Sequence, residues 1–247
     1  MSEQSSFDLT GKVVLVTGAA KRIGRSIALR LHREGARVLI HYSSSTADAE
    51  RTGAECGGAG LFQANLEHVD EIKRMFSAIA EREGRLDGLV NNAGRFTKID
   101  PLKVTEADWD YVHAVNLKAT FFAAQQAALL MQRNPGGEGR IVNISSMGAF
   151  LAWAEHVHYC ASKAGVIALT RSLAKALAPG ITVNSVAPGA IPFEEANEER
   201  IQSLTRSTPA GRPGTGEEIA EAVVYFLKAS NFVTGQTLQV DGGLGLR

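Results

Sequence analysis

The chain has 247 residues, with 26 Lys and Arg balanced by 26 Asp and Glu, so its formal net charge is zero. This balance excludes a strongly basic surface for nucleic acid or acidic membranes, and no apolar run approaches the length that spans a bilayer. The N-terminus is polar without a secretory signal, and there are only two cysteines, so we predict a cytoplasmic protein. The six histidines lack the spacing of metal ligands.

Short apolar runs alternate with stretches of helical periodicity along the whole chain. The runs lie at 13–16, 37–40, 61–64, 86–90, 140–144, 181–186 and 237–240. Continuous apolar runs bounded by turn residues are typical of parallel strands buried on both faces. The sequence therefore predicts one α/β domain over residues 1–247, doubly wound, with a mostly parallel seven-stranded sheet and helices on both faces.

The first run leads into a glycine-containing turn from Thr17 to Gly24 and then into a helical stretch from Arg25 to Glu34. Glycine lets the backbone approach a pyrophosphate, and the free N–H groups of a helix N-terminus face the anion. The order of strand, turn and helix predicts a Rossmann-like phosphate cradle, although Arg22 stands where a third glycine is common. The alternative is an ordinary βα turn.

The segment after the second run distinguishes between two dinucleotides. An acidic residue there holds a ribose 2′-hydroxyl, whereas a 2′-phosphate needs cations and hydrogen-bond donors. No Asp or Glu occurs between Ala36 and Ala47, where the sequence reads His41-Tyr42-Ser43-Ser44-Ser45-Thr46. With Lys21 and Arg22 available from the first turn, we predict an NADP(H) site; a polar loop without a ligand is the alternative.

Tyr159 and Lys163 stand four residues apart in a stretch that reads as helix from His158 to Ala178. Positions i and i+4 share a helix face, so we expect the Lys163 cation beside the Tyr159 phenol. A nearby cation lowers the pKa of a tyrosine towards neutrality, where proton exchange with a substrate oxygen becomes practical. The pair predicts carbonyl/alcohol chemistry, against the alternative of a surface lysine covering a half-buried tyrosine.

Taken in order, these features resemble the short-chain dehydrogenase/reductase family over nearly the whole chain. Further matching landmarks are Asn91-Asn92-Ala93-Gly94 after a strand, Asn116 in a long helix that a Thr105–Asp108 capping box opens, Ser146 thirteen residues before Tyr159, and Pro188-Gly189 after a strand. The resemblance implies a homotetramer or homodimer, assembled through the long helices that hold Asn116 and Tyr159 and through the C-terminal strand.

The resemblance also implies roles for four catalytic residues. Tyr159 donates a proton, Lys163 lowers the pKa of Tyr159 and holds the nicotinamide ribose, Ser146 orients the substrate carbonyl, and Asn116 supports a water that connects Lys163 with solvent. Together with the phosphate turn and the second strand end, the expected contacts of NADPH are Gly18, Lys21, Arg22, Ile23, His41, Ser43, Ser44, Ser45, Asn65, Leu66, Asn92, Ala93, Gly94, Tyr159, Lys163, Pro188, Gly189 and Ile191.

The substrate is less closely defined by the sequence. The Ser146 hydroxyl suits an oxygen substrate and favours NADPH-dependent reduction of a carbonyl, either a 3-oxoacyl thioester, as in β-ketoacyl carrier-protein reductases, or another ketone. Arg22, His41-Tyr42 and Phe96 resemble the pteridine reductases instead, although those enzymes commonly carry Asp at the Ser146 position. A third reading is a non-catalytic NADP(H)-binding sensor.

We expect aromatic residues to line the substrate pocket. Residues 147–157 and 193–212 should shape it, and Phe96, Phe150 and Trp153 indicate an apolar small-molecule substrate, with an aromatic one among the options.

Overall fold

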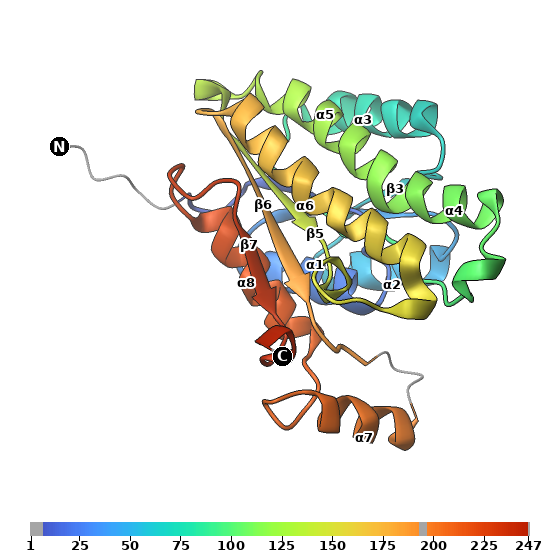
Figure 1. The fold of residues 1–247 in the computed structure, drawn as a ribbon. Helices are drawn as coiled ribbons and strands as arrows, with labels where there is room; N and C mark the ends of the chain where they lie inside the picture. Colours follow the sequence, from blue (N-terminus) through green and yellow to red (C-terminus); the bar gives the residue numbers. More distant parts are fainter. Residues whose placement is uncertain (1–6, 193–196, 247) are drawn as a thin grey trace.

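The computed structural model describes residues 7–192 and 197–246 (Figure 1). Seven strands form one sheet in the order β3-β2-β1-β4-β5-β6-β7, and all neighbours pair in parallel. This confirms the predicted fold class, and each predicted run lies on a strand with limits that differ by two residues at most. The strands are β1 (Val13–Val16), β2 (Arg37–Tyr42), β3 (Gly60–Gln63), β4 (Gly88–Asn91), β5 (Gly139–Ile144), β6 (Ile181–Pro188) and β7 (Thr237–Val240).

Helices cover both faces of the sheet, as Figure 1 shows. Alternate residues of one strand enter opposite cores: Val14 and Val16 pack with α1 and α8, whereas Val13 and Leu15 pack with α3 and α5. This period of two follows from the pleat and explains why the strands are apolar throughout. The helices are α1 (Arg22–Arg33), α2 (Thr46–Glu55), α3 (Val69–Glu83), α4 (Glu106–His113), α5 (Ala119–Met131), α6 (Val157–Leu177), α7 (Glu198–Ser207) and α8 (Gly216–Lys228).

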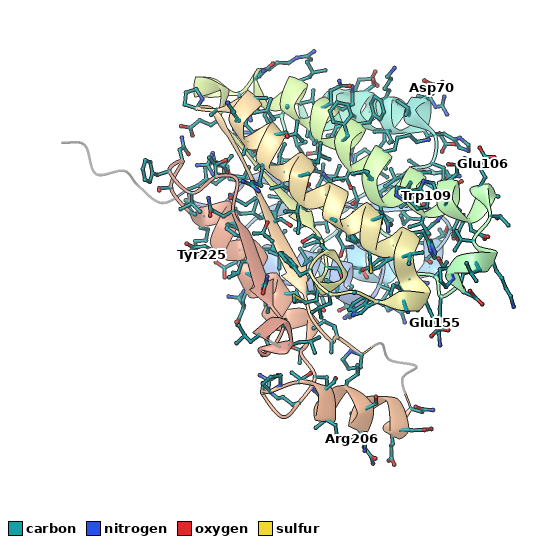
Figure 2. All side chains as sticks on the ribbon, in the orientation of Figure 1. Asp70, Glu106, Trp109, Glu155, Arg206 and Tyr225 are labelled. Carbon is teal, nitrogen blue, oxygen red and sulfur yellow. The ribbon has the colours of Figure 1, made fainter. Side chains whose placement is uncertain are left out.

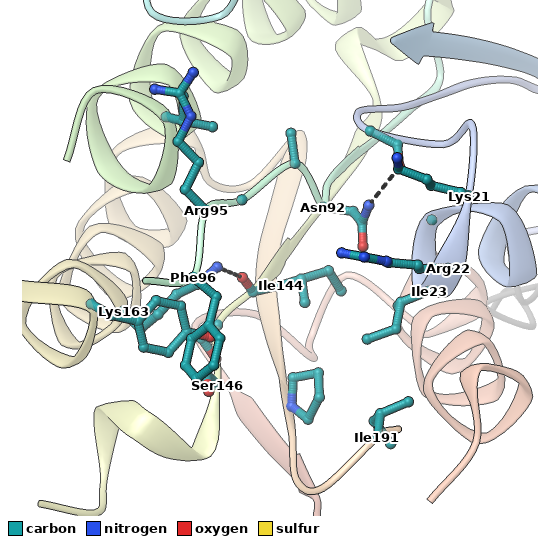
Figure 3. A pocket seen from close by; sticks show the side chains of 18 of the residues that line it. Lys21, Arg22, Ile23, Asn92, Arg95, Phe96, Ile144, Ser146, Lys163 and Ile191 are labelled. Carbon is teal, nitrogen blue, oxygen red and sulfur yellow. Dashed lines mark hydrogen bonds between the residues drawn. The ribbon is translucent and has the colours of Figure 1, made fainter. Parts of the chain in front are cut away.

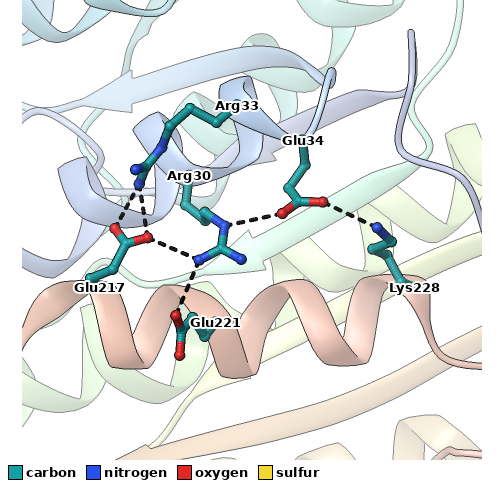
Figure 4. Close-up of polar contacts among 6 residues, drawn as sticks. All are labelled: Arg30, Arg33, Glu34, Glu217, Glu221 and Lys228. Carbon is teal, nitrogen blue, oxygen red and sulfur yellow. Dashed lines mark hydrogen bonds and ion pairs between the residues drawn. The ribbon is translucent and has the colours of Figure 1, made fainter.

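Helices α1 and α8 are also joined by a network of charged side chains (Figure 4). Glu217 on α8 accepts from both Arg30 and Arg33 on α1, at 2.9 and 2.7 Å. Arg30 also pairs with Glu34 at 3.1 Å, and Glu34 accepts from Lys228 at the far end of α8 at 3.1 Å. The network therefore ties the helix that follows the phosphate turn to the last helix of the chain.

The predicted capping box is confirmed at the start of α4. The Thr105 hydroxyl accepts from the Asp108 amide at 3.2 Å, and the Asp108 carboxylate accepts from the Thr105 amide at 3.0 Å. Asn116 also lies in a long helix as expected, because α4 continues through a π-helical turn at Ala114–Lys118 into α5. Such turns often mark functional sites, and here the turn carries Asn116.

No helix in the described part of the chain is long and apolar enough to cross a bilayer.

Candidate active site

A cleft of about 1090 Å³ lies at the carboxyl ends of the central strands (Figure 3). The strand order reverses between β1 and β4, and ligands of open α/β sheets bind beside such a reversal. The predicted site residues that line the cleft are Gly18, Lys21, Arg22, Ile23, His41, Ser43, Ser44, Ser45, Asn65, Leu66, Asn92, Ala93, Gly94, Phe96, Ser146, Trp153, Tyr159, Lys163, Pro188, Gly189 and Ile191. Asn116 lies buried behind the cleft, and Phe150 is not among its lining residues.

The turn between β1 and α1 is braced against the end of β4. The Thr17 hydroxyl accepts from the amides of Asn92 and Ala93, at 2.9 and 3.0 Å. The Asn92 side chain donates in return to the carbonyls of Thr17 and Gly18, at 2.9 and 3.2 Å. A β-carbon on Gly24 would lie 2.2 Å from the Gly18 carbonyl oxygen, so this close packing requires glycine. The cradle is thus held in shape by the chain itself.

Arg22 occupies the turn with a positive φ of 57°, the left-handed region that glycine normally fills. The chain therefore keeps a basic side chain at a position that costs about 1–2 kcal/mol of backbone strain. Lys21 and Arg22 lie across the cleft from Lys163 and Phe96 in Figure 3. Among the described lining residues there is no Asp or Glu, and Ser43, Ser44 and Ser45 lie on the same cleft.

His41 lines the cleft, but both of its ring nitrogens are bound to the protein backbone. Its Nδ1 accepts from the Gly18 amide at 3.0 Å, and its Nε2 lies 3.0 Å from the Ala64 carbonyl. A backbone amide can only donate and a carbonyl can only accept, so the ring is neutral with its proton on Nε2. Burial lowers the pKa of His41 to about 4. The predicted cofactor contact therefore also braces the turn, from the side opposite Asn92.

Asn65, one of the expected NADPH contacts, uses its side-chain oxygen to accept from the Glu67 amide at 3.1 Å. Arg95, which was not among the predicted site residues, also lines the cleft and forms an ion pair with Glu67. The Arg95 guanidinium lies 3.6 Å from the Tyr111 ring centroid and donates to the Tyr111 carbonyl at 3.0 Å. The available signal in the sequence was the position of Arg95 directly after Gly94, because that segment carries predicted cofactor contacts.

Tyr159 and Lys163 share a face of α6 as predicted, but the expected lowering of the tyrosine pKa is wrong for this structure. Burial raises the pKa of Tyr159 to about 12, and a hydrogen bond with Ser146 opposes that rise. The Lys163 ammonium instead donates to the carbonyl of Ile144 at 2.8 Å, and it lies 5.9 Å from the Tyr159 ring centroid (Figure 3). Burial lowers the pKa of Lys163 to about 8.

Ser146 is buried at the end of β5, beside Tyr159. Its hydroxyl accepts from the Gly148 amide at 3.0 Å, which fixes the side chain at the start of the following 3₁₀ turn. With one acceptor position occupied, the hydroxyl keeps its proton available as a donor. Ser146 and Tyr159 therefore form a pair of neighbouring hydroxyls on the same cleft wall.

Asn116 fixes the backbone behind the side chains that are predicted to be catalytic. Its Oδ1 accepts from the Arg95 amide at 2.7 Å, and its Nδ2 donates to the Arg95 carbonyl at 3.0 Å. Nδ2 also donates to the Ser162 hydroxyl at 3.1 Å, which in turn donates to the Tyr159 carbonyl at 2.7 Å. The π-helical turn thus connects the segment after β4 to the helix that carries Tyr159 and Lys163. The predicted water-supporting role of Asn116 stays a prediction.

The two segments expected to shape the substrate pocket both contribute to the cleft. Leu151 and Trp153 come from the first, and Leu204 and Ser207 on α7 come from the second. Residues 193–196 of the second segment lie outside the described residues. Phe150, predicted as a substrate contact, is 46% exposed outside the cleft lining. In the part of the chain that the structure describes, no three His, Cys, Asp or Glu side chains gather closely enough to hold a metal ion.

The parallel sheet, the glycine turn and the Ser146, Tyr159 and Lys163 cluster together define an oxidoreductase of the short-chain type. A family model described as Enoyl-(Acyl carrier protein) reductase matches residues 18–245. Nodulation protein G of a Rhizobium species is 41% identical over 97% of this chain and 99% of its own length. The 3-oxoacyl-[acyl-carrier-protein] reductase FabG of Staphylococcus aureus is 38% identical over 94% of this chain and 98% of its own.

Among solved structures, the angucycline C-6 ketoreductase LanV with bound NADP is similar, with a TM-score of 0.89 and 33% identity. The match covers 97% of this chain and 98% of that one. The chain therefore belongs to the short-chain dehydrogenase/reductase family, and it resembles the β-ketoacyl reductases within it.

Proposed function

We propose that the chain is an NADPH-dependent reductase of carbonyl compounds, either 3-oxoacyl thioesters or other ketones, with Tyr159 as the proton donor. The observation that carries this proposal is one continuous cleft with Lys21, Arg22 and three serines at one end and Ser146, Tyr159 and Lys163 at the other. The names of the S. aureus reductase and of LanV with NADP point the same way.

The residues at the first end of the cleft fit a nucleotide with a 2′-phosphate. Two cations and three hydroxyls supply donors, and a carboxylate that would repel the phosphate is absent from the described lining residues. Ser45, the last of the three serines, directly precedes α2. Reduced nicotinamide, once bound, supplies the hydride.

Tyr159 is suited to hold the proton that the reaction needs. Because its pKa is about 12, the phenol stays protonated at neutral pH and can donate to a substrate oxygen as that oxygen gains negative charge. The Ser146 hydroxyl next to it can donate a second hydrogen bond to the same oxygen. The buried Lys163 ammonium, which donates to the Ile144 carbonyl at 2.8 Å, lines the same part of the cleft. The carbonyl carbon receives the hydride, the oxygen receives the proton, and an alcohol results.

Cofactor choice is tested by thermal shift with NADPH and with NADH. A ligand at about 100 times its dissociation constant stabilises the native state by about 2.7 kcal/mol, which raises Tm by roughly 5–11 °C for a chain of this size. We expect the larger shift with NADPH. A larger shift with NADH would show that the cluster of Lys21, Arg22 and serines does not select the 2′-phosphate.

The reaction is tested by loss of NADPH absorbance with acetoacetyl thioesters, diketones and dihydropterins. Reduction of the carbonyl compounds supports the proposal. The alternative of a pteridine reductase is favoured by the exposed Phe96 ring in the cleft, which could stack on a flat heterocycle, and reduction of dihydropterins alone would establish it. NADPH binding without any turnover would instead identify a sensor. Tyr159→Phe should lose turnover and keep NADPH binding.

Assembly into a homodimer or homotetramer is part of the same proposal. Helix α5 contains no charged residue, and Leu129 on it is 50% exposed. Trp109 on α4 and Tyr225 on α8 lie at the surface, 42% and 55% exposed (Figure 2). Large apolar side chains at the surface favour burial against a second subunit. Light scattering on the purified chain would give the mass, and a monomer would contradict the proposal. The cytoplasmic location stays a prediction.

A further inference from the structure

The end of the cleft beyond Ser146 is walled by aromatic rings. Phe96 and Trp153 both line it, and the Phe96 side chain is 51% exposed. The Phe96 ring stands at 82° to that of Tyr159, with centroids 4.8 Å apart, and at 84° to that of Trp153, 6.3 Å away. The rings of Trp153 and Tyr159 are parallel within 3° and 6.2 Å apart. The rings of Phe96, Trp153 and Tyr159 therefore form an aromatic corner, which includes the proposed proton donor Tyr159.

The Phe96 ring is fixed by its neighbours. His156 stacks on one face of the ring, with centroids 4.4 Å apart and planes 17° apart, so that face is covered. The His156 ring also donates through Nδ1 to the Thr97 carbonyl at 2.7 Å, and the Thr97 hydroxyl lies 2.5 Å from Nε2 of His158. An aromatic surface that is already fixed binds a flat ligand at low cost in conformational entropy.

On the other side of Phe96, the backbone of Arg95 is held at both its amide and its carbonyl by Asn116. Phe96 therefore lies between two anchored residues, which hold its ring in the cleft wall.

The charges around this corner exclude an anionic substrate. The basic side chains among the described lining residues are Lys21, Arg22, Arg95 and Lys163. The first two belong to the phosphate turn, Arg95 is ion-paired, and Lys163 donates to a backbone carbonyl. Apart from these cations, the described lining residues that follow Ser146 along the chain include Leu151, Leu204, Ser207 and Leu244, which carry no charge. A carboxylate or phosphate on the substrate would therefore be desolvated without a partner, which is costly.

We propose that this corner selects uncharged aryl ketones, and that Phe96 is the residue that determines this specificity. The proposal rests on the carbonyl reduction inferred above and names its substrate class. The aromatic ring of the substrate lies against the exposed part of the Phe96 ring and beside Trp153, while its carbonyl oxygen meets Tyr159. The hydride goes to the carbonyl carbon and the Tyr159 proton to the oxygen, so the product is a benzylic alcohol and the nucleotide leaves oxidised.

The test uses 1-tetralone and 1-decalone, which share one carbon skeleton and one carbonyl and differ in whether the second ring is aromatic. Their dissociation constants are measured by calorimetry on the NADP⁺-loaded protein, and kcat/KM is measured with NADPH. Contacts between aromatic rings predict about tenfold tighter binding of 1-tetralone. Phe96→Leu should reduce that ratio to about twofold. Phe150→Leu, the same change at an exposed ring outside the cleft lining, should leave the ratio at about tenfold.

The outcomes separate this proposal from the function on which it rests. If both ketones bind equally, if neither binds, or if Phe150→Leu lowers the ratio as much as Phe96→Leu does, aryl selection is overturned. If neither ketone is reduced but the tenfold binding difference persists and depends on Phe96, aryl selection stands and carbonyl reduction fails. Equal kcat/KM for the two ketones would leave reduction intact and remove the specificity.

Discussion

His41 is predicted to make the stability of the fold sensitive to mild acid. Its ring is neutral in the native state, since Nδ1 accepts from Gly18 and Nε2 donates to Ala64. Protonation would place an N–H opposite the Gly18 amide, so the protonated ring does not fit. The native pKa of about 4 lies below the ordinary value of 6.5, so protons bind preferentially to the unfolded chain. The stability that neutral His41 contributes is therefore complete above about pH 6.5 and is lost as the pH falls towards 4.

The size of the effect follows from the distance between the two pKa values. A difference of about 2.5 pKa units corresponds to about 3 kcal/mol, since one unit is 1.36 kcal/mol. For a chain of this length, that lowers Tm by roughly 6–12 °C. Carboxylates also titrate in this range, so the comparison must isolate the contribution of His41.

Urea unfolding at pH 7.5 and at pH 4.5 provides the measurement. His41→Gln keeps a donor and an acceptor but cannot titrate, so its loss of stability between the two pH values should be smaller than that of the unmodified chain by about 2–3 kcal/mol. His68→Gln, at an exposed position near the end of β3, is the matched control and should lose as much as the unmodified chain. Equal losses in the unmodified chain and in His41→Gln would refute the reasoning.

Substitutions at four other positions test the phosphate turn, the buried lysine, the ion pairs between α1 and α8, and the cap of α4. Gly24→Ala places a β-carbon 2.2 Å from the Gly18 carbonyl oxygen, so we expect NADPH binding to weaken at least about a hundredfold or the variant not to fold, as calorimetry and circular dichroism would show. Turnover should fall above about pH 8 as buried Lys163 loses its proton, whereas Lys163→Met should give low turnover with no such step in its pH–rate profile. Glu217→Gln should cost no more than about 1 kcal/mol, because the pairs are partly exposed. That difference should shrink in 1 M salt, and also as the pH falls below the ordinary value of 4.5, because burial raises the pKa of Glu217 but its bonds with Arg30 and Arg33 lower it on balance. Thr105→Ala should cost about 1 kcal/mol in urea unfolding by removing the cap of α4, and an unchanged midpoint would contradict that role.

Much of the fold could be predicted because its signals are local in sequence. The strands are apolar throughout since both faces are buried, and the Thr105 cap is encoded within four residues. Most of the candidate site could be placed as well, because the carboxyl ends of parallel strands meet at one edge and bring Gly18, Ser146 and Pro188 to the same cleft.

The rest depended on contacts between distant segments. Nothing near His41 in sequence shows that Gly18 and Ala64 would occupy both of its nitrogens. The sequence placed Tyr159 and Lys163 on one face of a helix, but it did not show that the Lys163 ammonium donates to the carbonyl of Ile144. The predicted lowering of the Tyr159 pKa was therefore wrong. Phe150 and Phe96 carry the same side chain, and the sequence alone does not show that Phe96 lines the cleft whereas Phe150 does not.

The link between α1 and α8 also bears on how the chain is made. Arg30 and Glu217 lie 187 residues apart, so the ribosome completes α1 long before its packing partner exists. At about 5–20 residues per second, the interval is roughly 10–40 s. During that time the nascent N-terminal half exposes Ile27 and Leu31, which α8 later covers. Translation speed and chaperone supply, more than native stability, should then set the yield of folded protein.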